Sequence, residues 1–440
     1  MTRTTIDFGI DLGTTNSAIA VLKGIGTEVI KNNLDQDITP SAVSYDKKGV
    51  LYVGDRAKKR IIDKPRDAFV EFKRRMGTEF VYQFEESRLS RKPEELSAEV
   101  LKSLKGDVAR ALGEDIQAAV ITVPAAFELH QCNGTRKAAE LAGLKGSPLV
   151  QEPVAAALAY GFQLDSEKAY WLVYDFGGGT FDAALIKAEE GLINVVHHGG
   201  DNHLGGSDID WAIIERIVVP KLTENYDLPE FKRGNDRWQR ELLKLKRSVE
   251  MAKIELTTKE STTLTECMFE DQSGSQVDCE ELTITRKEVV GVAEPFIRRS
   301  IEICHKVLRD KNLAASGVQK VILVGGPTKA SYFREIITEG LGILVDHSVD
   351  PLTVVARGAA VFAGIQKIDA KLLPRAQPGE FQIDLKYKAM GHEIDPLIGG
   401  KVQGSPERSV EGFTIELVND PGKKYRLSYR PGYHPNRLAQ

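Results

Sequence analysis

An α/β fold with more than one domain is predicted from three features of the sequence. Short apolar runs typical of strands alternate with segments whose apolar residues recur at helical spacing. Such alternation is typical of largely buried sheets covered by helices. The chain has 440 residues, which suggests roughly two to four domains. A hairpin-like stretch with a glycine-containing turn occurs at 6–24 and again at 170–191, and this weak internal repeat indicates two related halves.

Periodicity and turn residues predict the individual elements. Proline and glycine are expected to mark element ends, as Pro124 does for a strand and Gly143 for a helix, and Pro295 is expected to kink or start a long helix. Hairpins or strands are predicted at 6–24, 118–127, 170–191 and 262–285, helices at 95–112, 135–144, 208–222, 237–256, 286–310 and 353–366, and units containing both at 149–162 and 320–337.

The composition changes after about Ile368. The stretch 367–379 carries prolines and is predicted to be a linker. Alternating apolar residues in 380–440 predict a small β-rich segment, which could be part of a truncated C-terminal domain because it is short for a core of its own.

Charge and composition exclude several classes of function. The net charge of −4 and the pI near 6.2 argue against a nucleic-acid-binding surface. No run of about 18 apolar residues is present, so we expect no membrane span, and the N-terminus lacks a signal-peptide pattern. The four cysteines are few for this length, which favours a reducing, cytoplasmic location. Cys267 and Cys279 flank a turn-like EDQSGSQ segment and could face each other across a hairpin, but a disulfide or metal role is disfavoured.

Three glycine turns are candidate anion sites, because consecutive backbone N–H groups without side chains can contact phosphate oxygens closely. Carboxylates at two of these turns would repel a bare polyphosphate, so they indicate a hard cation such as Mg²⁺, often held through water. The turns are Gly13-Thr14-Thr15, Gly177-Gly178-Gly179 and Gly325-Gly326, and the acids are Asp11, Asp175 and Asp182.

A lone glycine turn is weak support, since glycines mark many hairpins, but two similar hairpins and a strand–Gly-Gly–helix unit together predict a metal–nucleotide clamp. The patterns of P-loop, dinucleotide, serine-hydrolase and HExxH zinc sites are absent. The stretch HHGGDNH at 197–203 is expected to be a surface turn leading into the helix at 208, in preference to a metal site.

These motifs together resemble the Hsp70 chaperone family, which has an actin-type ATPase fold. The resemblance covers about residues 5–366 and rests on several segments in the family's order: IDLGTTNS, VPAAF, QEPVAAALAYG, YDFGGGTFD, GGDNHLGGSDID, ILVGGPTKA and ARGAAVFAG. It implies a nucleotide-binding domain over 1–366, of two lobes with duplicated ribonuclease H-like cores. Lobe I would comprise about 1–170 and 350–366, and lobe II about 171–349.

The resemblance also implies residue roles. ATP or ADP and Mg²⁺ would be the cofactors, with K⁺ a further possible ion, and in-line attack of water on the γ-phosphate would be the reaction. The implied catalytic residues are Lys73, Glu152, Asp175, Thr180 and Asp182, and the implied metal site comprises Asp11, Asp175 and Asp182. The implied nucleotide-binding residues are Gly13, Thr14, Thr15, Gly177, Gly178, Gly179, Glu250, Lys253, Gly325, Gly326 and Lys329.

Two of these assignments also have purely structural interpretations, without a role in nucleotide binding. Lys73 lies in the basic run FKRRMG and could be solvated, and Glu250 and Lys253 could form an ordinary i,i+3 surface pair. The chain departs from the family at Ile254 and Lys329, where the family usually has an arginine near the adenosine.

Further departures are Leu352 for aspartate and Cys132 for a relay arginine, and the sequence after 366 lacks the family's leucine-rich linker. A chaperone would bind client polypeptides and J-domain and nucleotide-exchange co-chaperones. The alternative is an actin-fold ATPase scaffold or regulator whose nucleotide state controls partner binding. A small-molecule kinase is disfavoured, because nothing resembles a sugar-binding insertion.

Overall fold

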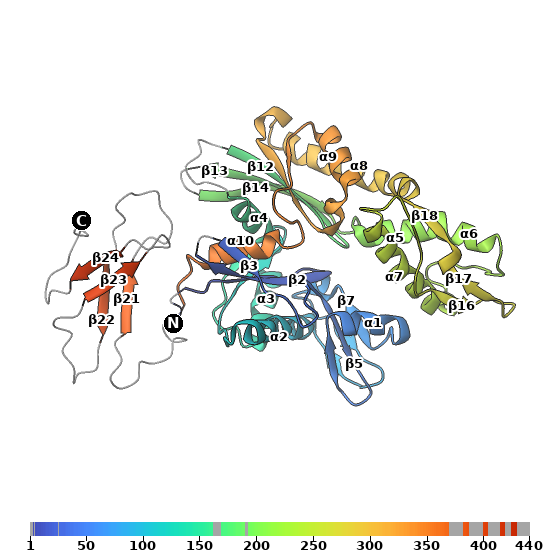
Figure 1. Ribbon diagram of the computed structural model, residues 1–440, viewed down its shortest axis with the longest axis horizontal. Helices are drawn as coiled ribbons and strands as arrows, with labels where there is room; N and C mark the ends of the chain where they lie inside the picture. Colours follow the sequence, from blue (N-terminus) through green and yellow to red (C-terminus); the bar gives the residue numbers. More distant parts are fainter. Residues whose placement is uncertain are drawn as a thin grey trace.

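The computed structural model describes most of the chain up to Ile368 and four short strands beyond it. The described ranges are residue 3, 5–24, 26–161, 169–189 and 192–368, with the strands at 382–386, 399–403, 414–418 and 424–428. Two lobes, each built on its own mixed sheet, form the main body (Figure 1). This confirms the predicted α/β class and its two related halves.

The first lobe is built on a six-stranded sheet of order β11-β10-β1-β2-β3, with β4 paired to β2. Strand β1 is antiparallel to β2 and parallel to β10. The strand bounds are β1 Phe8–Asp11, β2 Asn16–Lys23, β3 Gly26–Val29, β4 Thr39–Pro40, β10 Val120–Val123 and β11 Leu149–Gln151.

Alternation along β1 and β2 directs side chains to opposite faces of this sheet. Phe8, Ile10 and Ile19 join one core with the helices α2 (Pro93–Leu112) and α3 (Leu129–Leu141). Ala18 and Ala20 face the other way, against α10 (Val354–Ala363). Small residues on this second face allow α10 to lie close to the strands.

A smaller part of the first lobe carries helix α1 (Asp55–Asp63) beside a three-stranded sheet of order β6-β5-β7. The side chain of Lys73 comes from a 3-10 turn, Phe72–Arg75, directly after this sheet. The strands are β5 Ala42–Tyr45, β6 Leu51–Val53, β7 Ala68–Val70 and the pair β8 Tyr82–Gln83 and β9 Ser90–Arg91.

The second lobe is built on a five-stranded sheet of order β14-β13-β12-β19-β20. Its central strands are buried on both faces, as their continuous apolar runs require. The strands are β12 Ala169–Phe176, β13 Phe181–Glu189, β14 Leu192–Asp201, β19 Lys320–Val324 and β20 Val345–Asp346.

Helices and two short strand pairs complete the second lobe. Thr285 and Glu288 form a capping box at the start of the longest helix, α8. The helices are α5 Gly206–Ile213, α6 Val219–Thr223, α7 Gln239–Glu255, α8 Arg286–Arg309 and α9 Ser331–Leu341. The pairs are β15 Ser261–Thr263 with β18 Thr283–Thr285, and β16 Met268–Glu270 with β17 Gln276–Asp278.

The two lobes meet where helix α4 (Glu152–Ala159) crosses α10 (Figure 1). Alanines of both helices, among them Ala155 and Ala359, are fully buried in one core with Val173 and Ile322 of the second sheet. A Cβ added at Gly358 would lie 1.6 Å from the carbonyl oxygen of Ala155. The glycine therefore sets how closely the crossing helices approach.

Replacing Gly358 with alanine is expected to lower the free energy of unfolding by at least about 1–3 kcal/mol, the usual cost of overpacking a core. Gly106→Ala on α2 is the matched control, because a Cβ there meets nothing within 4 Å and should stabilise the helix by about 0.5–1 kcal/mol. Denaturant unfolding of both variants measures the difference. Equal stability of the two variants would contradict the crossing described above.

Several predicted elements differ from the structure in detail. The helix predicted at 135–144 begins earlier, at Leu129, because Glu128 and Gln131 form a capping box there. The helix predicted at 208–222 is interrupted by a π-helical turn at Ile214–Val218. The hairpin predicted over 262–285 is one strand pair nested within another. Pro295 lies inside α8 and does not start it.

The β-rich character predicted for the C-terminal segment is confirmed for its described strands. These form two antiparallel pairs, β21 Gln382–Lys386 with β22 Gly399–Gln403, and β23 Thr414–Val418 with β24 Lys424–Ser428. Most of the predicted linker, from residue 369 onward, lies outside the described residues. Among those that are described, no helix combines the length and apolarity needed to cross a bilayer.

Candidate functional site

Two glycine turns, one from each lobe, meet between the lobes. Gly13 to Thr15 join β1 to β2, and Gly177 to Thr180 join β12 to β13. A Cβ added at Gly178 would lie only 2.3 Å from the Oγ1 of Thr15, so the turns are in direct contact. That hydroxyl is buried and has no hydrogen-bond partner among the described residues. An unsatisfied buried hydroxyl between two such turns fits a phosphate oxygen.

The second turn is held in place through its carbonyl groups. Gly206 N–H donates to the Gly177 oxygen at 3.0 Å, and Ser207 N–H donates to the Gly178 oxygen at 2.7 Å. Arg74 of the first lobe donates from Nη2 to the Gly179 oxygen at 2.7 Å. All three glycine carbonyls are therefore engaged, and the Gly177 N–H donates to the Thr180 oxygen at 2.9 Å. The turn thus offers an anion the amides of Gly178 and Gly179.

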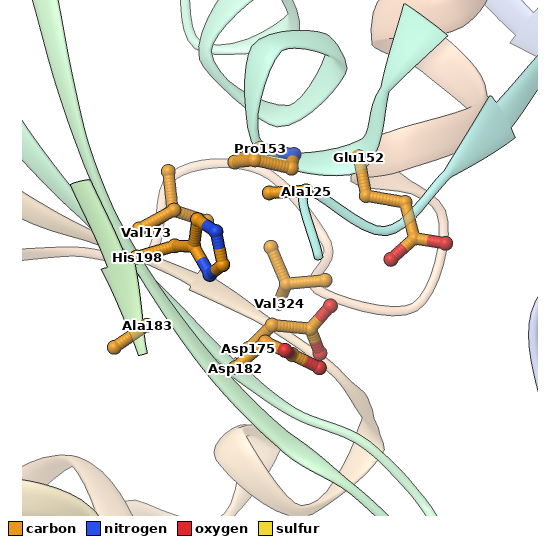
Figure 2. A pocket seen from close by; sticks show the side chains of 10 residues that line it. Ala125, Glu152, Pro153, Val173, Asp175, Asp182, Ala183, His198 and Val324 are labelled. Atoms are coloured by element: carbon orange, nitrogen blue, oxygen red, sulfur yellow. The ribbon is translucent and has the colours of Figure 1, made fainter. Parts of the chain in front are cut away.

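Four acidic side chains gather beside these turns. Asp175 and Asp182 stand opposite each other on β12 and β13. Asp11 ends β1 and accepts a hydrogen bond from Thr122 at 3.2 Å, and Glu152 begins α4. Figure 2 shows the carboxyl groups of Asp175 and Asp182 side by side, with Glu152 across the cavity from them. The predicted acids therefore come together from both lobes.

Lys73 is the cation of this cluster. Its Nζ lies 2.7 Å from Oε1 of Glu152, and its side chain is only 4% exposed. The same ammonium lies 5.6 Å from the ring centre of Phe127. The interpretation of Lys73 as a solvated residue of a basic run is therefore wrong.

The three aspartate carboxyl groups of this cluster carry raised pKa values, because burial and mutual repulsion disfavour their charged forms. Burial and the charge of Glu152 raise the pKa of Asp182 to about 7. The same two causes raise that of Asp11 to about 7, against the opposing effects of Lys73 and Thr122. Burial, Glu152 and the other two aspartates raise the pKa of Asp175 well above its usual range. Such a cluster favours binding of a cation.

The stability of the metal-free protein is expected to fall as pH rises from about 4 to about 7. In that window the unfolded aspartates ionise while the folded ones retain their protons, so the unfolded state gains the advantage. Asp182→Asn, which cannot ionise, should lose less stability over the same range. Melting temperatures of both proteins in chelator measure this difference, and parallel pH profiles would contradict it.

A cavity continues from the acids toward the second sheet. It is lined by Asp175, Asp182 and Glu152 at one end and by His198 among apolar side chains at the other (Figure 2). His197 and His198 lie on β14, which continues to Asp201, so the surface turn predicted for 197–203 is wrong as far as Asp201. The sequence missed His198 as a cavity residue because no motif marks an inward-facing position on that strand.

The two α7 residues predicted to bind the nucleotide are held in separate ion pairs. Glu250 pairs with Lys58 of α1 at 2.8 Å, and Lys253 pairs with Asp210 at 2.5 Å. Lys253 also donates to the carbonyl oxygen of Gly206 at 2.9 Å. The alternative interpretation, an ordinary surface salt bridge between Glu250 and Lys253, is therefore wrong. Asp210 ends the GGDNHLGGSDID segment, but nothing in the sequence paired it or Lys58 with α7, because only the tertiary structure brings them there.

The third glycine turn lies next to the second. Gly325 has a φ of +93°, and an added Cβ would lie 2.1 Å from the Phe176 carbonyl oxygen. Lys329 directs its ammonium to Asp350 at 3.0 Å, and both side chains are more than two-fifths exposed. Gly325 is thus close to the strand that leads into the second turn, whereas the Lys329 ammonium is held by an acid.

Sequence comparisons agree with this arrangement. A family model described as "Hsp70 protein" matches residues 7–91 and 82–374. The chain belongs to the Hsp70 family. Similar curated proteins include "Chaperone protein DnaK" of Thermotoga petrophila, 37% identical over 359 residues, and that of Nitrosopumilus maritimus, 34% identical over 362 residues.

Each of these Hsp70-family matches covers 81% of this chain but only 59% and 56% of the respective relatives. The chain therefore matches somewhat more than half the length of these curated relatives. The family assignment confirms the two-lobed actin-like ATPase fold, and the residues matched by the family model include every predicted site residue.

Proposed function

We propose that this chain binds Mg²⁺–ATP between its lobes, hydrolyses it slowly, and couples the nucleotide state to binding of a client polypeptide. The observation that carries the proposal is the direct contact of two glycine turns from different lobes beside four partly buried acids and one buried lysine. Hsp70 proteins are ATPases in general, and this cluster lies where phosphates would meet a metal ion. A cytoplasmic location is proposed with it.

The acids fit Mg²⁺ through their chemistry and their charge, because hard oxygen donors and an excess of negative charge suit this ion. In the described part of the chain, no three acidic, histidine or cysteine side chains are placed to hold one metal directly. We therefore propose that Asp11, Asp175 and Asp182 contact Mg²⁺ mainly through retained water molecules. When bound, the ion would neutralise charge on the phosphate oxygens.

The remaining steps rest on residues of the chain. The amides of Gly178 and Gly179 and the hydroxyls of Thr14, Thr15 and Thr180 would hold the phosphates. Lys73, fixed by Glu152, would orient the attacking water and stabilise the transition state. On the base side, Glu250 and Lys253 would hold the ribose, and Gly325, Gly326 and Lys329 would line the base; K⁺ would be an auxiliary ion.

Lys58→Ala is expected to accelerate ADP release by up to about 5-fold, because a partly exposed ion pair such as Lys58–Glu250 is worth about 1 kcal/mol or less. Both side chains are about one-third exposed. Arg240 and Asp63 join the same two helices at 2.7 Å but are 60% exposed, so Arg240→Ala should have a smaller effect. Stopped-flow release of fluorescent ADP tests this order, and the reverse order would contradict it.

The chaperone part of the proposal is tested by ATP turnover of the full chain with an unfolded peptide and a J-domain protein. We expect turnover to rise with both together. No change with either would leave the ATPase proposal standing and remove the coupled-chaperone proposal.

A second candidate is an ATPase scaffold whose nucleotide state controls binding of a folded partner. The family match ends at residue 374, and strands β21–β24 lie beyond it. Turnover that responds to neither peptide nor J-domain, with partner capture that depends on ATP, would favour this candidate.

A further inference from the structure

Two cysteines face each other at the far end of the second lobe, where the β16–β17 hairpin lies (Figure 1). Met268 pairs with Asp278 in this hairpin, so Cys267 and Cys279 are the next opposing residues. Cys279 N–H donates to the Cys267 carbonyl oxygen at 3.1 Å, which extends the strand pairing to this position. The two residues are therefore fixed opposite each other by backbone contacts.

The two sulfur atoms lie close together in a dry environment. Their Sγ–Sγ distance is 2.8 Å, and both residues are 0% exposed. Opposing residues of an antiparallel pair have Cα atoms about 4.5–5.5 Å apart, and a disulfide accepts about 4.4–6.8 Å. A bond between these sulfurs therefore needs only a small movement of side chains.

Packing alone could explain a buried cysteine, since the thiol behaves as a small apolar group. Cys304 is such a case, because it lies on α8 within the core of the second lobe. Cys267 and Cys279 differ from it in directing their sulfurs at each other from opposite sides of the hairpin, one residue before β16 and one residue after β17. This alignment is what a covalent link requires.

We propose that Cys267 and Cys279 are an oxidative modification site, a dithiol that a small-molecule disulfide such as oxidised glutathione converts to an intramolecular disulfide. In the first step the Cys267 thiolate attacks one glutathione sulfur, and one glutathione leaves as its thiolate. The Cys279 thiolate then attacks the Cys267 sulfur of the mixed disulfide and displaces the second glutathione. The two cysteines lose two electrons and two protons, and oxidised glutathione is reduced to two glutathione molecules.

Local opening of the hairpin controls the rate of this reaction. The hydrogen bond from Cys279 and burial both raise the pKa of Cys267, so the reactive thiolate is scarce in the closed hairpin. Each strand of β16–β17 has only three residues, and the strands pair only with each other. Short isolated pairs open more readily than central strands. Once formed, the disulfide closes back into the core, so a reductant reaches it only when the hairpin opens again.

The disulfide would also make the hairpin that contacts α7 more rigid. Lys244 of α7 donates to the Met268 carbonyl oxygen at 2.9 Å, and Arg247 lies 3.5 Å from Glu266. The same helix carries Glu250 and Lys253. A covalent link at the base of the hairpin therefore acts on the helix that carries two of the proposed nucleotide-binding residues.

The test uses the full chain incubated with oxidised glutathione in a low denaturant concentration that opens the hairpin, followed by dilution, alkylation and peptide mass analysis. We expect a Cys267–Cys279 crosslinked peptide, alkylated Cys304, and a higher melting temperature that returns to its starting value with reductant. Recovery of Cys267 and Cys279 as free thiols or as stable glutathione adducts would overturn the proposal.

Serine substitutions separate the pair from the other cysteines. Cys279→Ser should stop at the glutathione adduct of Cys267 and show no rise in melting temperature. A variant with Cys132→Ser and Cys304→Ser should form the disulfide as the natural chain does. A crosslink from Cys267 to Cys132 or Cys304, or a rise in melting temperature without Cys279, would equally overturn the assignment.

Discussion

Lys73→Ala is expected to reduce ATP turnover by roughly 10²–10³-fold, the usual effect of removing one group that stabilises transition-state charge. ATP binding should persist, because the glycine turns and the base-side residues remain. The structural reason is the buried contact of 2.7 Å between Lys73 and Glu152, next to three aspartates. Single-turnover hydrolysis and equilibrium binding of ATP measure the two effects separately.

Two controls distinguish a chemical role for Lys73 from a structural one. Arg75→Ala, in the same basic run but exposed beside Phe80, should leave turnover unchanged. The double variant Lys73→Gln with Glu152→Gln removes both charges of the pair and should recover stability without recovering turnover. Wild-type turnover in Lys73→Ala would remove this residue from the mechanism.

Gly178→Ala is expected to weaken ATP binding by about 10–100-fold, because overpacking costs about 1–3 kcal/mol and each 1.4 kcal/mol is about tenfold in affinity. The added methyl group would lie 2.3 Å from Oγ1 and 2.8 Å from Cβ of Thr15. A β-branched side chain is stiff and cannot turn away easily, so the two turns must move apart.

The effect of Gly178→Ala should be local to the cleft. Gly177→Ala should weaken ATP binding less, because its nearest atom is the Thr180 carbonyl oxygen at 3.3 Å. Gly106→Ala on α2 should not change ATP binding at all. Calorimetric titration of ATP into the three variants tests this order, and equal affinity of Gly178→Ala and Gly106→Ala would contradict the proposed contact.

The sequence could predict the residues that carry local signals. Two apolar runs around a glycine turn predict a hairpin, so the pattern alone places Asp11, Asp175 and Asp182 at turn edges. Resemblance to a family then places Lys73 and Glu152 with them. Both hairpins and the helices between them are confirmed, because their periodicity reflects real burial.

Other features depend on packing between distant segments and had no local signal. Lys58 and Glu250 are 192 residues apart and meet because α1 packs against α7. Arg74 and Gly179 are 105 residues apart and come from different lobes, so their contact likewise depends on the tertiary structure. His198 lines the cavity because a bulge between Leu185 and Ile186 shifts the register of β14 against β13. A periodicity argument cannot detect such a shift.

The sequence predicted the pairing of Cys267 and Cys279 only in part. Their placement on either side of a turn predicted that they could face each other, but not that their sulfurs would be buried and aligned. Burial depends on Phe269 and Val277, which anchor the hairpin in the core of the second lobe. Neither the cavity nor the alignment of the two thiols could therefore be predicted without the tertiary structure.

The most direct test of the proposed site is single-turnover hydrolysis of γ-labelled ATP by the full chain, with and without Mg²⁺, beside the variant Asp175→Asn. We expect labelled phosphate to be released slowly by the natural chain only when Mg²⁺ is present, and much more slowly by the variant. Release by both proteins at the same rate, or release that does not depend on Mg²⁺, would contradict the assignment of the acid cluster to a metal–nucleotide site.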